Sequence, residues 1–203
     1  MARVGLFGGT FNPIHVGHLM IAEEARLAAK LDRVVFIPSG ESYFKDPAQI
    51  ASREDRLAMT KLACAGRYEV SDIEIRREGP SYTSVTCRAF HEANPGDALF
   101  LILGADSLLE IDQWHDPAAI FDSAAVLAFA RGGEDRSAFL EKAEALRDTW
   151  GARVEVHEAF SLEVASSEIR RWIREGHAFR HLVTEPVAEY IRRHGLYGHH
   201  GIN

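Results

Sequence analysis

The chain has 203 residues, a length typical of one domain with a substantial core, and its 46% hydrophobic and 26% charged residues are ordinary for a soluble globular protein. Its formal net charge of −7, from 23 basic and 30 acidic residues, argues against binding of bulk nucleic acid, which needs a basic face. A small anion pocket is still compatible with this charge, because local charge can oppose the global sign.

Targeting and redox signals point to a cytoplasmic protein without membrane contact. No apolar run approaches the ~20 residues that span a bilayer, and no secretory signal opens the chain. The two cysteines, Cys64 and Cys87, fall in segments with a helical pattern. We expect both to be reduced thiols in the core.

The hydrophobic pattern alternates between strand-like and helix-like segments. In chain order it predicts strand 3–7, helix 17–30, strand 33–38, helix 52–65, strand 68–75, helix 84–93, strands 98–103 and 124–130, helix 136–150, strand 153–157, and helices 166–175 and 185–194. Nearly continuous apolar strands that alternate with helices predict an α/β fold. The expected architecture is a Rossmann-like, doubly wound parallel sheet with helices on both faces.

A glycine-rich loop at residues 8–18 follows the first predicted strand and runs into the first predicted helix. Glycines let the backbone approach a ligand closely, and a helix N-terminus presents N–H groups and the positive end of its dipole. Two histidines, His15 and His18, stand at this helix start with Gly17 between them. The segment therefore predicts a phosphate-binding site in which both imidazoles face one anion.

Other loop motifs fit this segment less well. No Gly-Lys-Ser/Thr closes it as in a P-loop, and Gly5, Gly8 and Gly9 lack the spacing of the dinucleotide fingerprint. No Glu follows His15, and the two histidines are not four residues apart as on a zincin helix. A metal-binding histidine pair stays open, although it would need further ligands.

Candidate polar residues follow four predicted strands at the ends where a parallel sheet binds its ligands. They are Gly8–His18, Ser39–Lys45, Asp106 and Arg131.

Two segments resemble a known superfamily. Residues 5–18 read Gly-x-Phe-Gly-Gly-Thr-Phe-x-Pro-x-His-x-Gly-His, which resembles the first motif of the H-x-G-H nucleotidyltransferases, and Val164–Arg170 resembles their second motif. Further segments narrow the resemblance to bacterial nicotinate-nucleotide adenylyltransferases: Pro80–Thr83, Gly104–Asp106 with Trp114, and Pro186–Ile191 with Leu196–Tyr197. The resemblance covers nearly the whole chain, so we expect one domain over 1–203, with a helical part at about 166–197 and a mobile tail at 198–203.

The resemblance implies an enzyme that transfers the adenylyl group of ATP to nicotinate mononucleotide in NAD biosynthesis. It implies that His15, His18 and Arg170 are catalytic and that Mg²⁺ is carried on the ATP phosphates, with no protein ligand to the metal. A homo-oligomer is left open. The implied ATP-binding residues are Gly8, Gly9, Thr10, Phe11, His15, His18, Ser166, Ser167 and Arg170.

A second set of residues is implied to bind the mononucleotide: Lys45, Tyr82, Thr83, Asp106, Trp114 and Arg131. In the family that the chain resembles, Trp114 would stack on the pyridine ring and Asp106 would bind the ribose. The backbone at Tyr82 and Thr83 would receive the nicotinate carboxylate.

The chain departs from the family pattern at three positions. Phe44 replaces a loop histidine, Ala165 replaces the first serine of the second motif, and Val85 replaces an Asp. The change at Phe44 leaves open the same reaction on nicotinamide mononucleotide. From another class, a non-catalytic nucleotide sensor on the same fold is the alternative.

Overall fold

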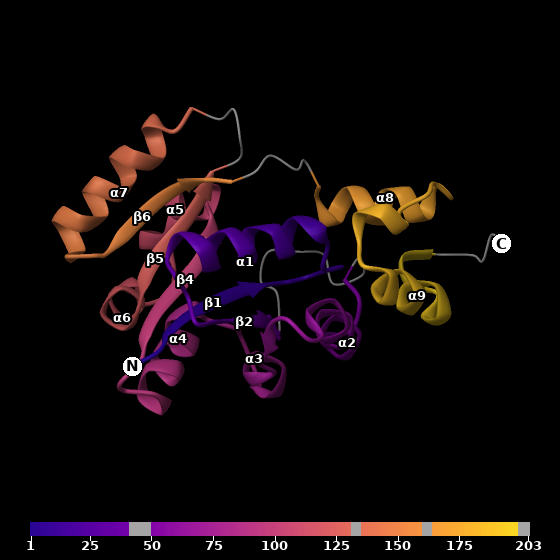
Figure 1. The fold of residues 1–203 in the computed structure, drawn as a ribbon, viewed down its shortest axis with the longest axis horizontal. Coiled ribbons are helices and arrows are strands. Elements are labelled where there is room, and N and C mark those ends of the chain that lie inside the picture. The colour runs from indigo at the N-terminus through magenta and orange to yellow at the C-terminus, as the bar shows by residue number, and fades with distance from the viewer. Residues whose placement is uncertain (41–49, 131–134, 160–163, 199–203) are drawn as a thin grey trace. The chain divides into compact units, whose positions relative to one another are not determined.

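The computed structural model describes residues 1–40, 50–130, 135–159 and 164–198 (Figure 1). Its strands form one six-stranded sheet in the order β3-β2-β1-β4-β5-β6, which is the strand order of Rossmann folds. The pairs β1/β4, β4/β5 and β5/β6 are parallel. The predicted Rossmann-like α/β fold is therefore confirmed. The strands are β1 (Arg3–Gly9), β2 (Arg33–Pro38), β3 (Glu69–Val70), β4 (Ala98–Gly104), β5 (Ala125–Ala130) and β6 (Val154–Glu158).

Helices connect and flank these strands. They are α1 (Val16–Ala28), α2 (Arg53–Cys64), α3 (Ile73–Arg76), α4 (Thr83–Ala93), α5 (Ala105–Glu110), α6 (Pro117–Ser123), α7 (Ser137–Trp150), α8 (Ser166–Arg174) and α9 (Glu185–His194). Short 3₁₀ turns cover Ile111–Gln113, Arg180–Leu182 and Leu196–Gly198. None of the helices in the described part of the chain is long and apolar enough to cross a membrane.

The central strands have the burial that their composition predicts. Every residue of β5 is buried, and Leu101 and Ile102 of β4 are less than 5% exposed. Such strands lie inside a parallel sheet covered on both faces, so they need apolar side chains at successive positions rather than in alternation. Cys64 and Cys87 are buried and do not form a disulfide with each other, and burial raises the pKa of Cys64 to about 12. Both cysteines are thus core residues in the thiol form, as expected.

Two regions differ from the sequence prediction. The strand predicted over 68–75 is wrong beyond Val70, because the Ser71 hydroxyl accepts a hydrogen bond from the backbone N–H of Ile73 (3.3 Å) and turns the chain into α3. Helices α5 and α6 were not predicted. The signal for α6 was present, since Asp116 caps it through Ala119 N–H (3.4 Å) and Pro117 follows at the first helical position.

The described residues fall into two compact units. The first unit contains Met1–Gly8, Ile21–Val35 and Ser81–Leu162, and the second contains Gly9–Met20, Phe36–Pro80 and Glu163–Asn203. In the first, α4 packs on α6, α5 packs on α7, and α7 runs beside β6 (Figure 1). In the second, α2 packs on α9. The single domain over 1–203 remains a prediction, and α8 and α9 form its expected helical part.

Candidate active site

The loop between β1 and α1 is held through its carbonyl groups. Thr10 O accepts from Arg56 Nη1 (2.9 Å), and Pro13 O accepts from Ser166 Oγ (2.9 Å). In a trans peptide the N–H points opposite to the C=O. The N–H groups of Phe11 and Ile14 therefore point away from Arg56 and Ser166, respectively.

Arg56 on α2 is the most buried charged residue that holds this loop, with 2% of its surface exposed. Besides Thr10 O, its guanidinium donates to Gly40 O (2.8 Å) and to Ala51 O (3.3 Å). Burial is the main cause that lowers its pKa. Sequence analysis missed Arg56, because on α2 it looks like its neighbour Arg53 and nothing local marks it as buried.

The position of the Phe11 ring accounts for the small residue at Gly9. Its φ of 47° lies in the left-handed region, which costs a bulky residue about 1–2 kcal/mol. Its ring is buried and packs against His18 (5.0 Å between ring centroids) and Phe36 (5.5 Å). A Cβ on Gly9 would lie only 3.0 Å from this ring. Because the Phe11 ring faces the core, any contact with ATP at this position is made by the backbone.

The two histidines stack on each other. Their ring centroids are 3.7 Å apart, and the backbone N–H of His15 donates to Nδ1 of His18 (3.1 Å). His15 is 7% exposed, its Nδ1 has no hydrogen-bond partner among the described residues, and burial lowers its pKa to about 4. A Cβ on Gly17 would lie 3.1 Å from that same Nδ1. A side chain at position 17 would therefore crowd the His15 ring in its present position.

Helix α8 presents one arginine to the loop and its neighbours to solvent. Arg170 is half-buried and donates from Nη1 to Asn12 O (2.8 Å), whereas Arg171 and Arg174 are exposed. Arg171 pairs with Glu168 on the same helix. Within the described part of the chain, Arg170 Nε has no hydrogen-bond partner. Arg170 is thus held at the loop and is not one of the surface charges of α8.

The remaining residues of the second motif differ in exposure. Ser166, at the start of α8, is half-buried and bonded to the loop as described, while Ser167 is exposed. Ser166 and Arg170 of α8 therefore both bond to carbonyls of the loop that precedes His15 and His18, and Asn12 is a further member that sequence analysis missed.

In the first unit, Tyr82 and Thr83, which are predicted to receive the nicotinate carboxylate, lie at the start of α4. Tyr82 stacks on His115 with 4.0 Å between ring centroids, and His115 Nδ1 lies 3.3 Å from Ser84 Oγ. Among the described residues no side chain caps α4, whose first residue is Thr83, so its first-turn N–H groups stay suited to an anion. Trp114 is half-buried and next to His115 in the chain.

The carboxyl ends of β1 and β4 leave open space. These strands are neighbours, with Phe7 paired to Ile102, and they form the point where the strand order reverses. A Cβ on Gly8 or Gly104 would meet no described atom within 4 Å. Asp106 follows Gly104 in the first turn of α5 and is exposed. Lys45, Phe44 and Arg131 lie outside the described residues.

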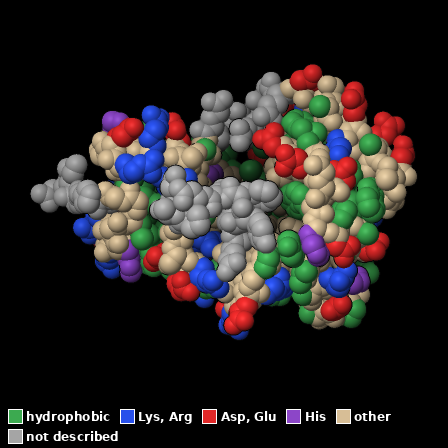
Figure 2. All heavy atoms as spheres, turned by 180° about the vertical axis from the view of Figure 1, so that it is seen from behind, with side chains coloured by type: hydrophobic (Ala, Val, Ile, Leu, Met, Phe, Trp, Pro, Cys, Tyr) green, Lys and Arg blue, Asp and Glu red, His purple; other side chains and the backbone are tan. Residues whose placement is uncertain are grey.

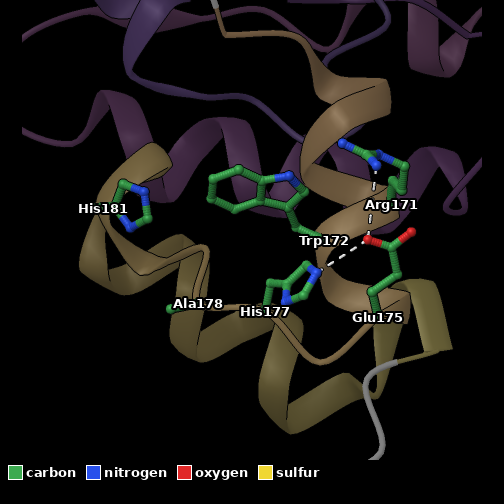
Figure 3. A pocket seen from close by; sticks show the side chains of 6 residues that line it. All are labelled: Arg171, Trp172, Glu175, His177, Ala178 and His181. Atoms are coloured by element: carbon green, nitrogen blue, oxygen red, sulfur yellow. Dashed lines mark ion pairs between the residues drawn. The ribbon is translucent and has the colours of Figure 1, made fainter.

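A surface groove in the second unit lies elsewhere (Figure 3). It has a volume of about 420 Å³ and is lined by Arg171, Trp172, Glu175, His177, Ala178 and His181. Glu175 pairs with His177 (3.3 Å) and with Arg171 (3.9 Å). None of the predicted site residues that the structure describes lines this groove.

Charge is mixed on the face of the protein shown in Figure 2. Lys and Arg side chains stand there among Asp and Glu side chains, and no continuous basic surface is visible over the described residues of that face.

Comparison with known proteins identifies the family. Residues 6–172 match the family model described as cytidylyltransferase-like. A relative from Roseiflexus sp. (strain RS-1), named "Probable nicotinate-nucleotide adenylyltransferase", is 42% identical over 200 residues, which cover 97% of this chain and 98% of the relative. The chain belongs to the nicotinate-nucleotide adenylyltransferase family. A second relative of the same name, from Geobacter metallireducens, is 40% identical and covers 97% and 99% of the two chains.

Solved structures agree on the fold of this family. Nicotinic acid mononucleotide adenylyltransferase of Plasmodium falciparum, complexed with NaAD, superposes with a TM-score of 0.80 at 16% identity, and 98% of each chain is covered. A structure from Vibrio parahaemolyticus, titled as that of a putative nicotinate-nucleotide adenylyltransferase, gives a TM-score of 0.66 at 18% identity and covers 99% of this chain and 98% of that one. At these identities the likeness shows the fold alone.

Proposed function

We propose that this chain transfers the adenylyl group of ATP to nicotinate mononucleotide, giving deamido-NAD and pyrophosphate in NAD biosynthesis. The observation that carries the proposal is the loop at residues 9–15, where two histidines and Arg170 of α8 meet in a chain that matches this family over nearly its whole length. These residues are the ones that the two motifs of the resemblance assign to ATP.

The chemistry requires positioning and charge stabilisation. The phosphate monoester of the mononucleotide attacks the α-phosphate of ATP, and pyrophosphate leaves. This nucleophile is already ionised near neutral pH, so a strong general base is not needed. Two polyanions must meet, however, and negative charge gathers on the leaving group, which makes cations and oriented N–H groups the effective catalysts.

Each group at the loop suits that task. His18 accepts at Nδ1, so its neutral ring carries the proton on Nε2 and can donate it to a phosphate oxygen. Arg170 uses one of its five N–H donors on Asn12 O, which leaves other N–H groups of its guanidinium for the β- and γ-phosphates. His15, whose pKa is about 4, binds as a neutral imidazole at physiological pH.

The groups of the first unit suit the pyridine nucleotide. The nicotinate carboxylate accepts from the N–H groups at the start of α4, near Tyr82 and Thr83. Trp114 provides an aromatic face for the ring, and Asp106 accepts from the ribose hydroxyls. Lys45 and Arg131 complete the proposed set. Gly8 and Gly104 leave the backbone open to close approach by a ligand.

Metal and assembly complete the proposal. We propose that Mg²⁺ is carried by the ATP phosphates, because Mg²⁺ takes oxygen ligands, whereas the histidines and Arg170 at the loop offer nitrogen atoms. Such an ion supplies further charge neutralisation on the leaving group. A cytoplasmic location and a homo-oligomer remain open to measurement.

The proposed function is tested by product analysis. The purified chain is incubated with ATP, nicotinate mononucleotide and Mg²⁺, and deamido-NAD and pyrophosphate are quantified together, with the His18→Ala protein as the blank. We expect the two products in equal amounts from the wild type. Saturable binding of ATP without either product would instead identify a nucleotide sensor.

A further inference from the structure

Asn12 is the residue at which three distant segments of the second unit are joined. Its side chain is 1% exposed, and its Oδ1 accepts two hydrogen bonds, from the backbone N–H of Ala51 (3.0 Å) and from the hydroxyl of Tyr197 (2.8 Å). Its backbone oxygen accepts from Arg170 Nη1 (2.8 Å). The two donors on Oδ1 fix the side chain of Asn12 and, with it, the backbone carbonyl that holds Arg170.

Tyr197 has a left-handed backbone conformation, which the glycines near it in the sequence also adopt. Its φ is 62°, while Gly195 and Gly198 on either side have φ of 58° and 78°. Glycine adopts this region without a steric penalty, and tyrosine does not. A tyrosine at such a position is retained only where its side chain makes contacts that outweigh the strain. The contact described for its hydroxyl is the hydrogen bond to Asn12.

The surroundings of the Tyr197 hydroxyl keep it a donor. Burial raises its pKa, so the hydroxyl carries its proton at any physiological pH. Burial outweighs the guanidinium groups of Arg170 and Arg56, which lower this pKa, and Asp55 raises it further. Both of these arginines also donate to carbonyls of the loop, at Thr10 and Asn12. The hydroxyl thus belongs to the set of groups that hold the loop from its protein side.

We propose that Tyr197 is a positioning residue for ATP. Its hydroxyl holds the side chain of Asn12 in place, and the backbone carbonyl of Asn12 in turn holds the guanidinium of Arg170 at the loop between β1 and α1. The proposal rests on the proposed function for its kinetic consequences, because Arg170 is there the clamp for the β- and γ-phosphates. Tyr197 does not touch substrate in this scheme. Its removal therefore affects steps that involve ATP more than binding of the mononucleotide.

The chain offers a matched control in Tyr190 on α9. Its hydroxyl donates to Asp55 Oδ1 (2.9 Å), so Tyr190→Phe also removes one tyrosine hydrogen bond between the C-terminal segment and the rest of the second unit. Tyr197→Phe and Tyr190→Phe are therefore expected to lower Tm to similar extents. Only Tyr197→Phe removes a hydrogen bond to a residue of the loop.

The experiment measures steady-state kinetics of wild type, Tyr197→Phe and Tyr190→Phe, each with ATP and with nicotinate mononucleotide as the varied substrate. We expect Tyr197→Phe to lower kcat/KM for ATP by about tenfold, since small displacements of a phosphate clamp are costly. KM for the mononucleotide should stay within about twofold of wild type in both variants. Tyr190→Phe should stay within about twofold of wild type in every parameter.

Binding of a non-hydrolysable ATP analogue, measured by calorimetry, gives a readout that does not need turnover. Weaker binding by Tyr197→Phe alone supports the inference. Wild-type affinity in Tyr197→Phe, or an equal loss in both variants, overturns it. A wild-type protein that makes no deamido-NAD would refute the proposed function, and the comparison of analogue binding would still decide the role of Tyr197.

Discussion

The backbone N–H of His15 donates to Nδ1 of His18 over 3.1 Å, and this bond fixes which nitrogen of His18 faces a ligand. Because Nδ1 accepts, Nε2 carries the proton and is the group that we assign to the transferring phosphoryl group. Removing one preorganised donor of this kind lowers kcat by ~10²–10³. We expect that loss in His18→Ala, with a melting curve close to that of wild type.

A second variant separates the donor from the loop contact. In His18→Asn, the side-chain oxygen can replace Nδ1 as the acceptor for His15 N–H, but the donor at Nε2 is lost. We expect this variant to be as slow as His18→Ala in steady-state assays. If either variant kept more than half of the wild-type kcat, His18 would have no part in the mechanism.

The planar fork of Arg170 is expected to matter more than its charge. Arg170→Lys keeps the positive charge but cannot hold the loop carbonyl and two phosphate oxygens together. Loss of one hydrogen bond to a charged group costs roughly 1.5–3 kcal/mol, which corresponds to a drop in kcat/KM for ATP of about 10- to 150-fold. Arg171→Lys on the same helix is the matched control, since Arg171 is exposed and paired with Glu168. Equal kinetics of the two lysine variants would refute the clamp.

Buried His15 should make the folded state sensitive to acid. Its pKa is about 4 in the folded chain and about 6.5 when unfolded, so between these values the unfolded chain binds more protons. The free energy of unfolding therefore falls as the pH falls through this window, by about 2 kcal/mol at pH 5 from this group alone. Urea unfolding at pH 7 and pH 5 measures the loss. We expect it to be smaller in His15→Gln than in wild type, and equal losses in the two proteins would count against a buried neutral His15.

Arg56 should be essential for stability although it is not assigned to substrate. Arg56→Met leaves the carbonyls of Thr10, Gly40 and Ala51 without this donor, and the bond to Gly40 O is fully buried. An unsatisfied buried group costs about 1–3 kcal/mol, so we expect a loss of at least about 1 kcal/mol in the free energy of unfolding. Arg53→Met is the control on the same helix, since Arg53 reaches Ile75 O only at 3.4 Å. A loss no larger than that of Arg53→Met would show that the three carbonyls find other donors.

Much of the fold was predictable because its signals are local. The continuous apolar runs of β4 and β5 and the loop after β1 depend on neighbouring residues only. The predicted strand over 68–75 was wrong because one hydroxyl, that of Ser71, ends it. The hydrophobic pattern of a sequence gives no indication of such a side-chain hydrogen bond.

The candidate site was predictable only in part. Its motifs identified His15, His18 and Arg170, but residues that hold the loop from a distance carry no local signal. Arg56 reaches Thr10 across 46 positions, and Tyr197 reaches Asn12 across 185. Even Arg170 could be told from Arg171 only by its match to the second motif. The structure separates them physically, because Arg170 faces a carbonyl of the loop and Arg171 faces Glu168.

The most direct measurement of the central claim is a side-by-side assay of nicotinate and nicotinamide mononucleotides with ATP and Mg²⁺. A carboxylate gains charge-assisted bonds from the N–H groups at the start of α4, whereas an amide presents NH₂ to the same donors. An unsatisfied buried pair costs roughly 1–3 kcal/mol, so we predict that kcat/KM is at least about tenfold higher for the nicotinate form. Equal kcat/KM for the two mononucleotides would contradict the assigned substrate.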